Sequence, residues 1–78
     1  MIEVRLYATL RRFSPEASTA GVFTLTLPED SSVKGLLSAI GISPSDVHLL
    51  MVNGASAELD RILSEGDRVG LFPPVGGG

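Results

Sequence analysis

One short segment with helical periodicity interrupts a chain that otherwise alternates apolar and polar residues, and this pattern limits the possible folds most strongly. Residues 33–40 carry Val, Leu, Leu and Ile at positions i, i+3, i+4 and i+7, the spacing of one helix face. Ser32 precedes them as a candidate N-cap, and Gly41 follows as a candidate left-handed residue that ends the helix. Gly35 within the helix costs about 1 kcal/mol relative to alanine, and we expect a close approach to the sheet to compensate.

Two alternating segments before the helix predict strands. Residues 2–10 place apolar side chains on one face, and residues 22–27 repeat this pattern with Phe23, Leu25 and Leu27 inward. The segment 14–21 between them is rich in small residues and reads as a surface loop. Two strands joined in this way favour a β-hairpin.

Three more strands are predicted after the helix. Residues 47–52 are nearly all apolar and indicate a central strand, and Asn53-Gly54 favours a type I′ turn into a short strand at 56–58. Residues 68–72 form the last strand. Between these strands we expect Leu59, Ile62 and Leu63 to close one end of the core. The predicted order is therefore β-β-α-β-β-β, an α+β fold.

Composition excludes several classes of function. Seventy-eight residues form one domain, and the sequence contains no cysteine and one histidine, His48. A disulfide scaffold, a thiolate zinc site and a multi-histidine metal site are thus excluded, and we assign no metal. A net charge of -3 argues against nucleic acid as a partner, and the apolar runs are too short to span a membrane. We expect a cytoplasmic domain.

The segment 73–78 differs from an ordinary polar terminus. It reads Pro-Pro-Val-Gly-Gly-Gly, with two prolines that favour an extended chain and three glycines that fit a channel too narrow for a Cβ atom. Six residues at about 3.3 Å each reach about 20 Å. We therefore divide the chain into a folded domain, residues 1–72, and a tail, residues 73–78, that presents the α-carboxylate of Gly78.

The chemistry of a tail carboxylate requires a partner. An α-carboxyl group with a pKa of about 3.5 is ionised at neutral pH and is a poor electrophile. Activation as a mixed anhydride with AMP would overcome this, but the chain has no GxxxxGK[ST] loop for ATP. The sequence thus predicts a substrate that is presented to enzymes and is not catalytic alone.

The strand order, the ending Leu71–Gly78 and the preceding Glu65–Val69 resemble the small subunit of molybdopterin synthase, one of the ubiquitin-like sulfur-carrier proteins. The resemblance covers the whole chain. It implies a ubiquitin-like β-grasp fold, with a mixed sheet of four or five strands packed on one main helix.

The resemblance also implies a reaction sequence and its partners. A homologue of ubiquitin-activating enzyme, using ATP and Mg²⁺, would adenylate Gly78, and a sulfur donor would convert the adenylate to a thiocarboxylate. The tail would then enter the large subunit of the synthase, where sulfur passes to the pterin precursor of the molybdenum or tungsten cofactor. The chain itself would bind no cofactor and would act as the sulfur-donating subunit of the complex.

Residue roles follow by position in the resemblance. Gly78 would carry the acyl group, and the partner-binding residues would be Gly77, Gly76, Val75, Pro74, Pro73, Phe72 and Arg11. Two of these have plainer alternatives. Arg11 and its neighbour Arg12 also fit a solvated strand end, and Phe72 also fits ordinary core, although its place opposite the inward face favours an exposed docking residue.

Other functions remain open from the sequence. The same tail suits a sulfur carrier of another pathway, such as thiamine biosynthesis, and a protein modifier that joins lysine side chains through the same adenylate. A non-covalent ubiquitin-like interaction module would not need the tail, and a flexible end without function is the plainest alternative.

Overall fold

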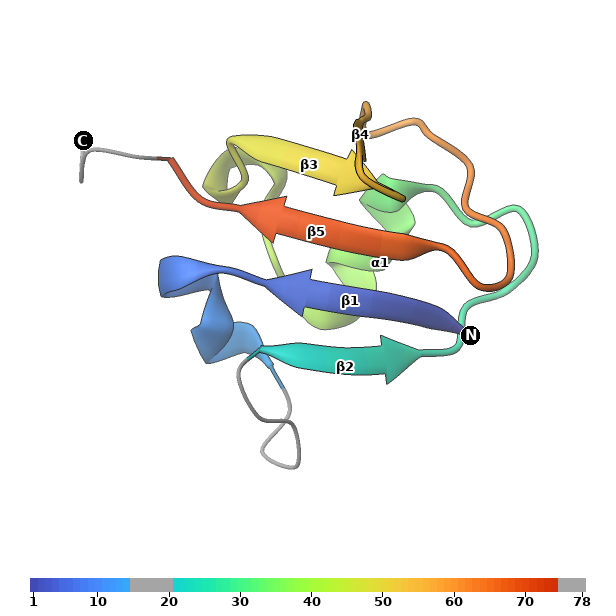
Figure 1. Cartoon of the computed structure of the whole chain (residues 1–78), viewed down its shortest axis with the longest axis horizontal. Helices are drawn as coiled ribbons and strands as arrows, with labels where there is room; N and C mark the ends of the chain where they lie inside the picture. Colours follow the sequence, from blue (N-terminus) through green and yellow to red (C-terminus); the bar gives the residue numbers. More distant parts are fainter. Residues whose placement is uncertain (15–20, 75–78) are drawn as a thin grey trace.

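Among the residues that the structure describes, five strands form one mixed sheet, and a single α-helix covers one of its faces (Figure 1). The computed structural model describes residues 1–14 and 21–74. The sheet order is β2-β1-β5-β3-β4. The strands are β1 (Ile2–Leu6), β2 (Val22–Leu25), β3 (Leu49–Val52), β4 (Ala55–Ser56) and β5 (Arg68–Phe72). The helix is α1 (Val33–Ile40), and two 3₁₀ helices are η1 (Ala8–Phe13) and η2 (Pro44–Asp46). The predicted order and the β-grasp fold are confirmed.

The predicted hairpin is confirmed, but its first strand is shorter than expected. β1 pairs antiparallel with β2, with Ile2 opposite Leu25. It ends at Leu6, whereas the alternation predicted a strand through residue 10. Ala8 has a φ of 50°, and the chain turns there into η1. Leu10 lies on the inward face of the predicted strand and is also buried in η1, so its apolar character fits either conformation.

Both predicted ends of the helix are confirmed. The Ser32 Oγ accepts a hydrogen bond from the Gly35 backbone N–H at 3.2 Å, which satisfies one free amide of the first turn. Gly41 adopts a φ of 93° and donates its N–H to the Leu37 carbonyl at 2.9 Å. The helix buries Val33, Leu36 and Leu37 completely against the sheet.

The third and fourth strands differ from prediction in extent and place. β3 begins at Leu49, after η2 and the exposed His48, and lies between β5 and the edge strand β4. The central strand is β5, because it is the only described strand with two strands on each side. Asn53 and Gly54 both have positive φ, at 54° and 83°, as a type I′ turn requires. This two-residue turn fixes β4 at residues 55–56 rather than 56–58.

The segment that closes the core after β4 fits the prediction in two of three residues. Leu63 is buried and Leu59 packs partly buried against the core, but Ile62 is 50% exposed. The backbone of Ile62 bridges Ser32 at the start of the helix, so we infer that this pairing leaves its side chain toward solvent. In the described part of the chain, no helix is long and apolar enough to cross a membrane.

Gly35 does not mark a close approach of helix and sheet, contrary to expectation. The residue is exposed, and the only neighbour within 4 Å of a Cβ atom placed there would be the Ser32 Oγ, at 3.8 Å. Nothing in the surroundings of this position therefore requires glycine.

We predict that Gly35→Ala stabilises the protein by about 0.5–1 kcal/mol, because alanine has the higher helix propensity and restricts the unfolded chain. Chemical denaturation monitored by circular dichroism measures this difference. A loss of stability would mean that the helix is constrained by contacts other than those described.

Candidate functional site at the exit of the last strand

The last strand pairs with a neighbouring strand on each side. On one side β5 pairs in parallel with β1, from Glu3 opposite Arg68 to Leu6 opposite Leu71. On the other it pairs antiparallel with β3, where Leu49 lies opposite Phe72. Val69 and Leu71 are fully buried. The chain that leads into the tail is thus anchored in the middle of the sheet.

The sheet pairing of this strand stops at the two prolines. The Tyr7 N–H donates to the Leu71 carbonyl at 3.2 Å, and the His48 N–H donates to the Phe72 carbonyl at 2.8 Å. Pro73 and Pro74 lack an N–H and cannot extend the ladder. The chain therefore leaves the sheet at the end opposite the N-terminus (Figure 1).

Two stacked aromatic rings mark this exit on the open face of the sheet. The ring centroids of Tyr7 and Phe72 lie 4.3 Å apart, and their planes differ by 4°. Phe72 is half-buried by this stack, so it is neither a core residue nor a fully exposed one. A Cβ atom at Gly70 would lie 3.6 Å from both rings, so glycine keeps the space beside the stack open.

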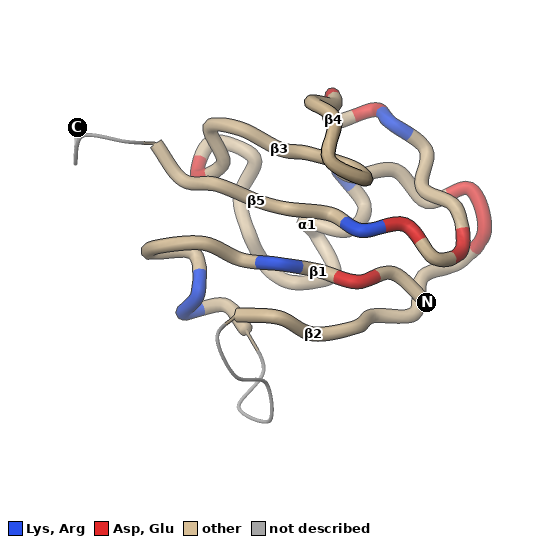
Figure 2. Tube along the Cα trace, in the orientation of Figure 1, with Lys and Arg blue, Asp and Glu red and all other residues tan. Residues whose placement is uncertain are grey.

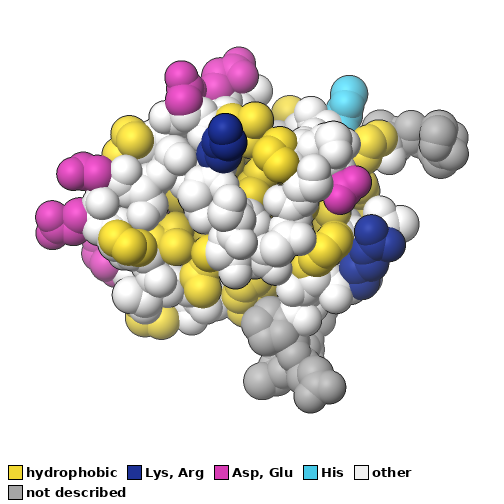
Figure 3. Space-filling view, turned by 180° about the vertical axis from the view of Figure 1, so that it is seen from behind, with side chains coloured by type: hydrophobic (Ala, Val, Ile, Leu, Met, Phe, Trp, Pro, Cys, Tyr) yellow, Lys and Arg dark blue, Asp and Glu magenta, His cyan; other side chains and the backbone are white. Residues whose placement is uncertain are grey.

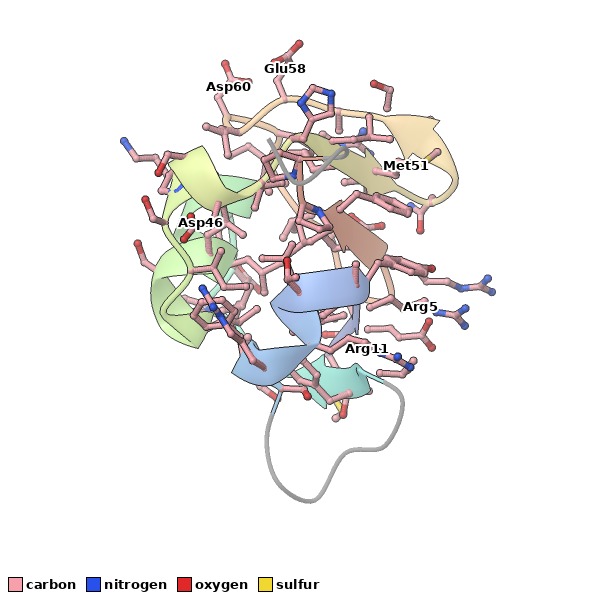
Figure 4. The ribbon with its side chains drawn as sticks, turned by 90° about the vertical axis from the view of Figure 1, so that its left-hand side faces the viewer. Arg5, Arg11, Asp46, Met51, Glu58 and Asp60 are labelled. Carbon is pink, nitrogen blue, oxygen red and sulfur yellow. The ribbon has the colours of Figure 1, made fainter. Side chains whose placement is uncertain are left out.

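A shallow groove of about 200 Å³ runs along this face. Figure 4, viewed from the tail end, shows Arg5 and Met51 on the same open side of the sheet. The lining residues are Arg5, Tyr7, Met51, Gly54, Arg68, Val69, Gly70 and Phe72. The groove thus combines an aromatic wall with two guanidinium groups, a composition that suits an apolar partner surface with carboxylates nearby.

The two arginines of the groove differ in their partners. The Arg5 Nε donates to the Glu3 Oε2 at 2.8 Å, and this hydrogen bond, with the carboxylate charge, raises the pKa of Arg5. Arg68 is exposed, and its backbone N–H donates to the Asn53 Oδ1 at 2.9 Å. We expect Arg68 to be the arginine that is more available to a partner carboxylate.

Arg11 lies on η1, at the same end of the molecule as the tail exit but beside β2 (Figure 4). Its side chain is exposed, and its Cγ would lie 3.1 Å from a Cβ atom at Gly21. The neighbouring Arg12 guanidinium lies 5.0 Å from the Phe13 ring centroid. Arg11 does not line the groove beside Phe72, and its role in partner binding remains a prediction.

Sequence reasoning missed a side-chain network that fixes the start of β5. The sequence indicates Asn53 only as a turn residue, but its Nδ2 donates to the Asp67 Oδ1 at 2.9 Å. The Asp67 Oδ2 accepts from the Ser64 backbone N–H at 2.8 Å. The Ser64 hydrogen bond, followed by the Asn53 amide, lowers the pKa of Asp67. The network ties the β3–β4 turn to the loop before β5.

The remaining predicted site residues, Val75, Gly76, Gly77 and Gly78, lie outside the described residues. Within the described ranges, no three His, Cys, Asp or Glu side chains gather where they could hold a metal ion.

We predict that Asp67→Asn lowers stability at neutral pH by about 1 kcal/mol, the net contribution of a typical hydrogen bond. Because the folded pKa of Asp67 lies below the unfolded one, the carboxylate stabilises the fold fully above the unfolded value of about 3.9. That contribution is lost as the pH falls through the folded pKa. Urea unfolding at several pH values should show the two proteins converging in acid, and a constant difference would disprove this role.

Solved structures with the same fold include archaeal and bacterial proteins. SAMP1 from Haloferax volcanii matches with a TM-score of 0.72 and 24% identity, covering 99% of this chain and 98% of that one. A putative molybdopterin converting factor, subunit 1, from Pyrococcus furiosus matches with a TM-score of 0.71 and 26% identity, over 95% and 97% of the two chains.

A third match comes from a protein–protein complex of subunits 1 and 2 of the molybdopterin-converting factor from Helicobacter pylori. Its TM-score is 0.62 at 23% identity, with 99% of this chain and 97% of that chain covered. At these identities the likeness establishes a shared ubiquitin-like fold. A search of curated proteins found no match.

The comparison with family models assigns the chain to a family, whereas these structures show only its fold. A family model described as Mut7-C ubiquitin matches residues 1–76. This range includes strands β1 to β5, helix α1 and the start of the tail. The chain therefore belongs to the Mut7-C ubiquitin family of ubiquitin-like domains.

Proposed function

We propose that this protein is a sulfur carrier whose Gly78 carboxylate is adenylated by a partner enzyme and then converted to a thiocarboxylate. The observation that carries the proposal is the course of β5. This strand pairs with β1 as far as Leu71 and with β3 as far as Phe72, and two prolines then direct the chain away from the sheet. A rigid base with an extended exit is the arrangement that delivers a terminal group into another protein's cleft.

The groove beside the exit supports docking of that partner. The Tyr7–Phe72 stack and Met51 offer apolar contact, and the Arg68 guanidinium offers a charge-assisted hydrogen bond. A partner that covers this groove would lie directly next to the exit of the tail. Arg11 would add a contact on the β2 side, to the enzyme or to its nucleotide.

Each chemical step uses groups supplied by partners. A Gly78 carboxylate oxygen attacks the α-phosphorus of ATP, and pyrophosphate leaves. The activating enzyme holds the Mg²⁺ that this step requires. The terminal sulfur of a persulfide on the donor protein then attacks the acyl carbon and displaces AMP. A thiol attacks the resulting acyl disulfide at the donor's sulfur, so that a disulfide forms on the donor and the Gly78 thiocarboxylate is released. The thiocarboxylate sulfur attacks an electrophilic carbon of the final acceptor and displaces an oxygen leaving group, and water then hydrolyses the resulting thioester, which leaves the sulfur on the acceptor and returns the Gly78 carboxylate. The molybdopterin-converting-factor likeness favours a pterin precursor held by a large subunit as this acceptor.

A second function is favoured by the likeness to SAMP1, whose structure is also described as small archaeal modifier protein 1. In a modifier, a lysine amine attacks the activated acyl carbon and an isopeptide bond forms. Both functions share the adenylation step. They differ in the product, which is a thiocarboxylate for the carrier and adducts on other proteins for the modifier. A sulfur carrier of another pathway would share the first product.

We predict that adding one residue after Gly78 reduces adenylation by about 100-fold or more, because the carboxylate then moves by about 3.3 Å from its reactive position. The assay is ATP-dependent pyrophosphate release with a purified ubiquitin-activating-enzyme-like adenylyltransferase from the same organism. Gly35→Ala serves as the matched control, since it alters an exposed helix position far from the tail in sequence, and it should react like the wild type.

Three outcomes would contradict the proposal. In the first, the extended variant reacts at the wild-type rate. In the second, the wild type does not react with an enzyme that is active on another carrier. In the third, the native protein continues beyond Gly78. If adenylation occurs and isopeptide adducts accumulate in lysate without a thiocarboxylate, the modifier function replaces the carrier function.

A further inference from the structure

Tyr7 lies between β1 and η1, where the first segment of the chain meets the end of β5. β1 ends at Leu6, and the backbone of Tyr7 remains extended, with a φ of -115° and a ψ of 151°. The Tyr7 N–H donates to the Leu71 carbonyl at 3.2 Å. Ala8 then has a φ of 50°, and the chain turns into η1. The backbone thus holds the Tyr7 side chain beside the end of β5.

Phe72 is the last residue of β5, and the tail leaves the sheet directly after it. The pairing of β5 with β1 ends at Leu71, whereas its pairing with β3 reaches Phe72. On the β3 side, the His48 N–H donates to the Phe72 carbonyl at 2.8 Å. On the β1 side, the Tyr7 ring lies parallel to the Phe72 ring, with 4.3 Å between the centroids. The ring stack therefore contacts Phe72 on the side where the backbone pairing has ended.

Core packing does not explain a tyrosine at position 7. Its side chain is 38% exposed and lies outside the hydrophobic core. Both rings of the stack lie over Gly70, since a Cβ atom there would be 3.6 Å from each of them. Stacked aromatic pairs are more favourable than the burial of their surface alone accounts for. The contact with Phe72 is therefore the described interaction that accounts for the aromatic ring of Tyr7.

The two segments that meet at the exit contribute no ion pair that could hold it. Residues 6–10 and residues 69–74 carry no charged side chain, as Figure 2 shows along β1 and β5. Figure 3 shows most acidic side chains of the helix-covered face gathered away from the exit. The orientation of Phe72 thus depends on backbone hydrogen bonds and on the ring stack.

We propose that Tyr7 is a positioning residue for the tail, because its ring holds Phe72 in one orientation and thereby sets the direction in which the chain leaves the sheet. The consequence for adenylation rests on the proposed function, whereas the contact itself does not. An extended tail of six residues spans about 20 Å, so a rotation of about 10° at its base would move its end by about 3.5 Å. A displacement of that size takes a carboxylate out of its reactive position.

Hydrogen exchange measured by NMR tests the contact in the absence of any partner. Tyr7→Ala removes the ring and keeps the backbone N–H. The His48 N–H, which is bonded to the Phe72 carbonyl, should then exchange about fivefold faster, as expected for the loss of a stacked aromatic pair. The Asn53 N–H, bonded to the Arg68 carbonyl at the other end of β5, is the internal control and should keep its rate. Tyr7→Phe restores the ring and should restore the His48 rate.

ATP-dependent pyrophosphate release with the activating enzyme measures the consequence for the reaction. Tyr7→Ala and Phe72→Ala should each lower kcat/KM about tenfold. The double variant should be no more impaired than either single variant, because Tyr7 acts through Phe72. Tyr7→Phe should recover most of the loss. Circular dichroism and urea unfolding verify that each variant is folded under the assay conditions.

Three results would overturn the proposal. In the first, the His48 N–H exchanges at the wild-type rate in Tyr7→Ala. In the second, the losses in kcat/KM multiply in the double variant, which would mean that the two rings contact the partner independently. In the third, Tyr7→Phe is as impaired as Tyr7→Ala. If the wild type is not adenylated, the proposed function fails, and the exchange rate of His48 alone then supports or overturns the role of Tyr7 in holding Phe72.

Discussion

The parallel hydrogen bonding between β1 and β5 is the interaction on which the rest of the structure depends. It joins the beginning of the chain to its last strand, and it unites β2 and β1 with β5, β3 and β4 in one sheet. The buried side chains of Val4, Leu6, Val69 and Leu71 lie along this pair and contact the helix side of the core. Because the two strands run in the same direction, η1 and the exit of the tail occur at the same end of the sheet.

This arrangement separates three surfaces on a very small domain. One face of the sheet is covered by α1, and the other presents the groove with the Tyr7–Phe72 stack directly beside the exit. The β2 edge lies beyond β1, away from this groove. Membership in a ubiquitin-like family agrees with this architecture, in which the central strand leads into the tail.

The sequence correctly predicted those structural features that depend on interactions between residues close together in the chain. Ser32, Gly41 and Asn53-Gly54 each act within a few residues, and all three adopt the expected conformations. The predicted end of β1 was wrong because Leu10 fits both a strand and a 3₁₀ helix, so the burial of this residue does not distinguish the two conformations. The Asn53–Asp67 contact joins residues that are 14 positions apart, and the Tyr7–Phe72 stack joins the residue after the first strand to the end of the last strand. Such contacts follow from the sheet register, which the sequence alone did not give. The roles of Gly76, Gly77 and Gly78 rest on chemistry and resemblance.

The state of the last peptide in the native protein tests the central claim most directly. Cleavage after Arg68 gives a peptide that begins at Val69 and contains no methionine, so methionine oxidation cannot imitate the replacement of oxygen by sulfur. Mass spectrometry of protein purified from its own cells should find this peptide ending at Gly78, with a fraction carrying one sulfur in place of one oxygen. A peptide that continues past Gly78, or one that never carries sulfur while the activating enzyme and sulfur donor are active, would contradict the account.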